Sequence, residues 1–105
     1  MSPQPGPAEG LADAVREAVL AVDGVADTHT GTFGEVGTYL PGRRVPGVRL
    51  RRDGAEVHAV LEWGAPVGAT ADAIRAATAS LTGAAVDVVI QDVAAPPDAV
   101  AGSRR

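Results

Sequence analysis

The sequence predicts an α+β fold in which two helices pack on one face of a three-stranded sheet, in the order α-β-β-α-β. Three features predict it: apolar residues recur at helical spacing in two segments, they alternate in others, and an Asp-Gly pair separates two alternating segments. The 105 residues, 46% of them apolar, suffice for one domain. We expect that domain at 8–93, between a flexible proline-rich lead at 1–7 and a flexible tail at 94–105.

The first predicted helix spans residues 8–22. Gly24 follows it as the expected stop, because glycine readily adopts the left-handed conformation that ends a helix. Only 3% of the chain is aromatic, so we expect a thin core of small side chains. The apolar face of the first helix is formed by Leu11, Val15, Ala18, Val19 and Val22.

Residues 26–47 form the least regular segment, interrupted by several glycines and two prolines. Long irregular segments in small domains are often functional. Part of it, near 36–40, is expected to form a short helical turn or strand. Phe33 and Tyr39 lie here, where an aromatic side chain indicates either packing onto the domain or a contact with a partner.

A β-hairpin is predicted next, from strands at 48–52 and 55–63 joined by a tight turn at Asp53-Gly54. Alternation places Val57, Ala59, Leu61 and Trp63 on one apolar face. Trp63 is expected to pack in the core or at its rim; the alternative is an exposed interface anchor.

The second predicted helix spans residues 70–81, and a last strand follows at 86–93. Thr70 is the expected N-terminal cap, and Asp72 suits the first turn. Gly83 is expected to end the helix. Its inward positions are Ile74, Ala77 and Leu81.

Composition excludes several classes of protein. The chain has no cysteine, which rules out disulfides, a thiolate catalyst and cysteine-ligated zinc. No apolar run approaches the roughly 20 residues needed to cross a bilayer. The N-terminal sequence lacks the basic and apolar regions of a secretory signal, so we expect a cytoplasmic protein. The net charge of −4 argues against general nucleic-acid binding.

One stretch is strongly basic within this acidic chain, since no acid occurs between Glu35 and Asp53. A functional patch here would bind phosphate groups of anionic lipid or nucleic acid, or an acidic partner. The alternative is a solvated strand face partly paired with Glu56 and Glu62. Nucleic acid is the less favoured ligand, because no aromatic side chains are expected to point outward for stacking. The basic residues are Arg43, Arg44, Arg49, Arg51 and Arg52.

The two histidines, His29 and His58, do not form a recognisable catalytic motif. His58 shares a predicted strand face with Glu56 and Glu62, which leaves open a small enzyme using these groups with the 26–47 segment. His58 and Glu56 would supply two ligands to a metal, too few to specify one. The ordinary interpretation is a surface histidine beside carboxylates. We therefore predict no catalytic residue, no cofactor and no metal.

Several segments together resemble a known family. Residues 11–25 (LADAVREAVLAVDGV) are similar to the first helix of the alkaline shock protein twenty-three (Gls-type) family, whose helix ends in a val-x-gly-val signature, here at 22–25. Residues 61–64 (LEWG) resemble the family's strand ending in an aromatic-glycine pair, with Trp63 where tyrosine is more usual. Residues 33–48 resemble a short actinobacterial branch.

The resemblance covers residues 10–93 and implies a function. It implies a non-catalytic envelope stress response protein, cytoplasmic and membrane-associated, which acts through protein–protein interaction and tends to form homo-oligomers. Its expected partner is a small membrane-anchored protein or a family paralogue, which holds it at the inner face of the membrane. A nucleic-acid-binding module using the arginines at 43–52 is the alternative.

Overall fold

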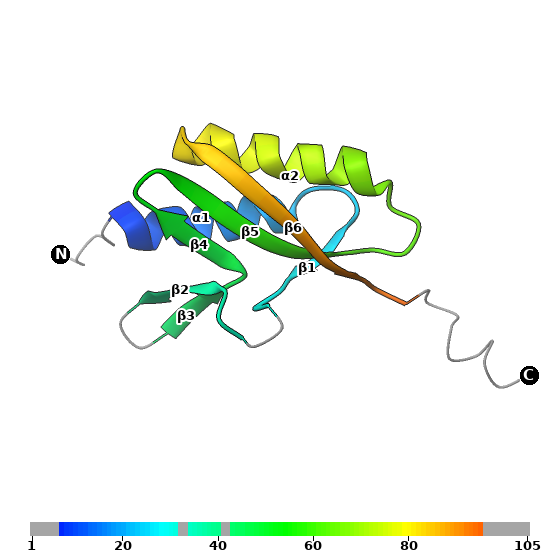
Figure 1. Cartoon of the computed structure of the whole chain (residues 1–105), viewed down its shortest axis with the longest axis horizontal. Helices are drawn as coiled ribbons and strands as arrows, with labels where there is room; N and C mark the ends of the chain where they lie inside the picture. Colours follow the sequence, from blue (N-terminus) through cyan, green and yellow to red (C-terminus); the bar gives the residue numbers. More distant parts are fainter. Residues whose placement is uncertain (1–6, 32–33, 41–42, 96–105) are drawn as a thin grey trace, which may run out of the picture.

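The computed structural model describes residues 7–31, 34–40 and 43–95, and the fold within them is α+β (Figure 1). A four-stranded sheet carries two helices, and a separate two-stranded hairpin lies beside it. The elements are α1 (Pro7–Leu20), β1 (Val25–Thr28), β2 (Gly37–Leu40), β3 (Arg43–Pro46), β4 (Val48–Arg51), β5 (Gly54–Leu61), α2 (Val67–Thr82) and β6 (Ala85–Val93).

Strand β5 is the centre of the main sheet. Strand β6 pairs with it in parallel along its whole length, from Gly54 to Leu61. Strand β4 pairs antiparallel with the first half of β5, and β1 pairs antiparallel with the second half. Because β6 occupies one edge of β5 throughout, β4 and β1 lie end to end along the other edge.

The sheet therefore has four strands, not the three that the sequence predicts. The missing strand is β1, a short element of only four residues, Val25–Thr28, with a register shift between Val25 and Asp27. Its two central residues are exposed, so it lacks the alternation by which the other strands were predicted. The irregular segment also contains more order than expected, because β2 and β3 pair as an antiparallel hairpin.

Helices α1 and α2 contact each other and the sheet, and Figure 1 shows α1 passing behind β4 and β5. The core between them is thin, as predicted: its largest fully buried side chains are Leu61 and Ile74. Strand β5 contributes alternate residues to it, and α1 contributes one face. The buried residues from these two elements are Ala12, Val15, Val19, Ala55, Val57, Ala59 and Leu61.

The hairpin turn lies one residue earlier than predicted. Arg51 pairs with Gly54, so the loop consists of Arg52 and Asp53, and Gly54 is the first residue of β5. Gly54 does not have a positive φ angle. Glycine is required there for another reason: a Cβ atom would lie 2.7 Å from the carbonyl oxygen of Ala85 on β6.

Helix α2 begins three residues before the predicted start. Pro66 is its N-cap residue, and Thr70, the predicted cap, is buried inside the helix. Asp72 lies beyond the first turn, where its carboxylate pairs with Arg75. Leu81 is exposed rather than inward, and Thr78 occupies a buried position instead. Gly83 ends the helix in the left-handed conformation, as predicted.

Candidate interaction surface

Glu56 is the centre of a polar network on the sheet face opposite the core residues of β5. Its carboxylate accepts a hydrogen bond from Arg51 and lies 3.6 Å from the guanidinium of Arg49. Arg51 also lies 3.6 Å from the carboxylate of Asp87 on β6. The two arginines that the sequence places on one strand face do point together, but they point at acids of the same sheet. Their charge is therefore largely compensated.

His58 extends this network along β5. Its Nε2 atom contacts the Glu56 carboxylate, and its Nδ1 atom lies 2.9 Å from the side-chain oxygen of Gln91. The hydrogen bond from His58, helped by its charge and those of Arg49 and Arg51, lowers the pKa of Glu56, although burial opposes the shift. His58 is buried, so the prediction of a surface histidine is wrong, although the carboxylate of Glu56 does lie beside it. This pattern of contacts is that of a structural histidine.

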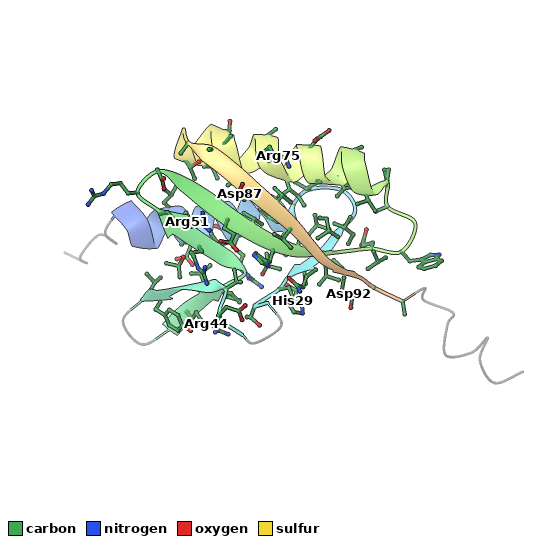
Figure 2. The ribbon with its side chains drawn as sticks, viewed as in Figure 1. His29, Arg44, Arg51, Arg75, Asp87 and Asp92 are labelled. Atoms are coloured by element: carbon green, nitrogen blue, oxygen red, sulfur yellow. The ribbon has the colours of Figure 1, made fainter. Side chains whose placement is uncertain are left out.

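The other predicted basic residues are dispersed. Arg44 on β3 donates to the carbonyl oxygen of Gly34 at 2.8 Å and stacks over the ring of Tyr39. Arg52 is exposed in the hairpin turn. Figure 2 shows Arg44 on the β2–β3 hairpin and Arg51 on the main sheet, so the predicted patch is divided between separate elements.

The remaining predicted interaction residues are Tyr39, Arg43 and Phe33. Tyr39 is 70% exposed, so it does not pack onto the domain, and its contact with a partner stays a prediction. The side chain of Arg43, at the start of β3, and the whole of Phe33 lie outside the described part of the structure. His29 accepts a hydrogen bond at Nδ1 from the backbone of Gly31, which makes it part of a local turn.

Trp63 does not pack in the core as first expected. Strand β5 ends at Leu61, so Trp63 no longer follows the inward alternation, and its side chain is 63% exposed. It lies beside an open hollow of about 570 Å³, and the alternative interpretation, an exposed anchor, fits this geometry. The hollow is lined by residues 22–24 of the α1–β1 turn, 62–66 after β5, and 69, 70 and 73 of α2.

A second hollow of about 370 Å³ also borders Trp63 and Glu62, and is completed by Ala26, Ala94 and Ala95. The indole therefore stands between two concave surfaces at one end of the sheet. Sequence reasoning missed this site because it is assembled from four separate segments. The one available signal in the sequence is Trp63 followed by Gly64 and Pro66, since glycine and proline favour the end of a strand.

Backbone contacts hold the main hollow in shape. The N–H of Glu62 donates to the carbonyl oxygen of Gly24 at 2.7 Å, and the N–H of Ala65 donates to Glu62 at 3.1 Å. Gly24 has a φ of +95°, and a Cβ atom there would meet Ala65 at 3.0 Å and Thr70 at 3.1 Å. The turn after α1 is thus packed directly on the turn before α2.

Within residues 7–31, 34–40 and 43–95, no grouping of three or more histidine, aspartate or glutamate side chains is suited to hold a metal. No helix in these ranges is long and apolar enough to cross a membrane. Comparison of the chain with protein-family models, with curated proteins and with solved structures gives no match. Two of the segments that carry the family resemblance, 22–25 and 61–64, contribute residues 22–24 and 62–64 to the main hollow.

Proposed function

We propose that this chain is a non-catalytic envelope stress response module that a membrane-anchored partner recruits to the inner face of the cytoplasmic membrane. The observation that carries the proposal is the exposure of Trp63 beside an open hollow. Large aromatic side chains seated near concave, desolvatable surfaces are the residues that contribute most to protein–protein binding.

The composition of the chain strengthens this argument. It has one tryptophan, one tyrosine and one phenylalanine, and its core is built from valine, alanine, leucine and isoleucine. Leaving the largest apolar side chain in water forgoes stabilisation that its burial would provide, on the order of 25 cal/mol per Å². A binding partner that covers Trp63 would recover that free energy.

The envelope and membrane parts of the proposal come from the family resemblance. They are supported by the position of two of its motifs, at 22–25 and 61–64, because residues 22–24 and 62–64 meet at the Trp63 hollow. An interaction function and the resemblance thus involve the same surface.

The alternative, nucleic-acid binding through the arginines at 43–52, has weaker support. Arg49 and Arg51 are engaged with Glu56, and Arg44 is held by the carbonyl oxygen of Gly34 and the ring of Tyr39. Phosphate binding depends on cationic side chains that are available to replace counterions. Among the arginines of this stretch whose side chains the structure describes, Arg52 alone is unengaged, and a single arginine offers little phosphate binding.

The proposal is tested by fractionating cells of the source organism that carry the tagged chain. We expect the wild-type protein in the membrane fraction and Trp63→Ala mainly in the soluble fraction. Glu17→Gln, which changes an exposed side chain on α1 that does not line the hollow, serves as the control and should behave as wild type. A wild-type protein found wholly in the soluble fraction would overturn the proposal.

A second measurement separates a protein partner from direct lipid contact. We expect the purified chain not to float with liposomes containing anionic lipid. Flotation that is lost when Arg43, Arg44 and Arg52 are replaced by glutamine would instead assign membrane association to the arginines.

A further inference from the structure

The ionisable side chains that line the Trp63 hollow are all acidic. Asp23 and Glu62 both line it, both are exposed, and neither side chain makes a hydrogen bond or ion pair within the described ranges. No arginine or histidine lines either hollow. Elsewhere the described acids tend to be paired, as Asp27 is with Arg16 and Asp72 is with Arg75.

The apolar part of the hollow is made of small side chains around one large one. Val22, Ala65, Pro66 and Ala69 form its surface, and the Trp63 indole stands at its margin. This surface accepts an aliphatic side chain, while the exposed indole face accepts a guanidinium or ammonium group through a cation–π contact. The start of α2 carries a partial positive charge, but two full negative charges beside it outweigh this dipole.

We infer that the occupant of the Trp63 hollow is a basic segment of the partner, in which arginine or lysine flanks an aliphatic residue. The aliphatic side chain would fill the apolar surface, and the cation would lie over Trp63 with Asp23 and Glu62 beside it. This inference rests on the proposed function and adds the chemistry of the partner. Membrane proteins carry an excess of lysine and arginine in the cytoplasmic chain next to their spans. A membrane anchor is therefore a source of such a segment.

Trp63 provides a direct readout because it is the only tryptophan in the chain. The probe is a short peptide of alternating leucine and arginine, titrated at low salt while the indole fluorescence is recorded. Matched peptides replace arginine with glutamine or glutamate. We expect binding by the arginine peptide alone, weakened by added salt because exposed charges are screened.

Variants then locate the binding site. Asp23→Asn with Glu62→Gln should weaken binding about tenfold, a change of about 1.4 kcal/mol. The control is Glu17→Gln with Asp53→Asn, which removes the same charge from exposed carboxylates outside the hollow and should leave the affinity unchanged. For Trp63→Ala, binding is followed by peptide fluorescence anisotropy and should weaken by a similar factor, whereas Trp63→Phe retains a π face and most of the affinity.

Three results would overturn the inference: equal effects of the two double variants, equal binding of the glutamine peptide, or no binding of the arginine peptide. Cell fractionation of Asp23→Asn/Glu62→Gln distinguishes this failure from failure of the proposed function. If the double variant stays at the membrane while Trp63→Ala leaves it, recruitment stands and the basic partner segment is wrong. If the wild type binds the peptide but never reaches the membrane, the partner chemistry stands and recruitment is wrong.

Discussion

The backbone N–H of Glu62 donates a hydrogen bond of 2.7 Å to the carbonyl oxygen of Gly24. This contact joins the end of β5 to the turn after α1 and places two segments, 38 residues apart in the sequence, at one site. It also fixes the spacing between the Asp23 and Glu62 backbones. The shape and charge of the hollow therefore depend on a turn that only glycine fits.

Replacing Gly24 with alanine should destabilise the fold by about 2 kcal/mol or more. The substitution combines a positive φ, costly for any residue with a Cβ atom, with contacts of 3.0 Å to Ala65 and 3.1 Å to Thr70. Gly64→Ala is the matched control, because Gly64 has a φ of +85° but open space around its Cβ position. Urea unfolding should show a larger loss for Gly24→Ala, and equal losses would exclude the packing contribution.

Leu61 and Trp63 lie two residues apart but should differ in their contribution to stability. Leu61 is fully buried, so Leu61→Ala should lower the free energy of unfolding by about 2 to 5 kcal/mol. Trp63→Ala should lower it by less than about 1 kcal/mol, because most of the indole is already in water. Thermal unfolding of the two variants measures both losses of stability. Similar losses would show that Trp63 packs in the core.

The Glu56 network should make stability depend on pH. Its pKa lies below the ordinary 4.5 because His58 hydrogen-bonds to the carboxylate and nearby positive charges stabilise it, although burial opposes this. The contribution is therefore fully present above the unfolded pKa and is lost as the pH falls through the lowered folded pKa. Glu56→Gln should be less stable than wild type at pH 7 by about 1 to 3 kcal/mol.

Urea midpoints from pH 7 down to pH 3 measure this dependence. The stability difference between wild type and Glu56→Gln should shrink toward the acid end of the range. Glu17→Gln, which replaces an exposed carboxylate on α1, controls for the change in net charge. A difference that stays constant over the whole range would contradict the assignment.

Thr78 offers a stabilising substitution. It is fully buried in α2, and its hydroxyl oxygen has no hydrogen-bond partner among the residues that the structure describes. An unsatisfied buried polar atom costs about 1 to 3 kcal/mol, so Thr78→Val should raise the unfolding free energy by about 1 kcal/mol. Thr82→Val, which removes an acceptor for the N–H of Ala84, should lower it instead. Denaturant unfolding of both variants measures these two changes in unfolding free energy.

Much of the fold could be predicted because its main elements have clear periodicity. Strand β5 alternates and is buried on one side, and α1 carries valines at helical spacing, so both were predicted within a few residues. Strand β1 could not be predicted, since it is short and its pairing to β5 is long-range. The hairpin turn was misplaced because Gly54 serves a close contact with β6 rather than a positive φ.

The candidate site was less predictable than the fold. The arginines of 43–52 are adjacent in sequence, but a strand boundary at Gly47 separates Arg44 from Arg49 and Arg51. Their acid partners Glu56 and Asp87 come from other strands, and the sequence suggested pairing with Glu56 but not with Asp87. The pairing that it also suggested with Glu62 is wrong for the arginine side chains that the structure describes. Trp63 was assigned to the core because the strand was extended two residues too far.

His58 also joins the two ends of the irregular segment. Its carbonyl oxygen accepts from the N–H of His29, and its own N–H donates to the carbonyl oxygen of Gly47, both at 2.9 Å. The chain thus leaves the sheet edge and returns to it at a single residue of β5. Insertions or deletions between those two points need not shift the register of any strand in the main sheet. We expect length variation among related sequences to concentrate there, as in a loop that evolution can exchange while the rest of the domain is retained.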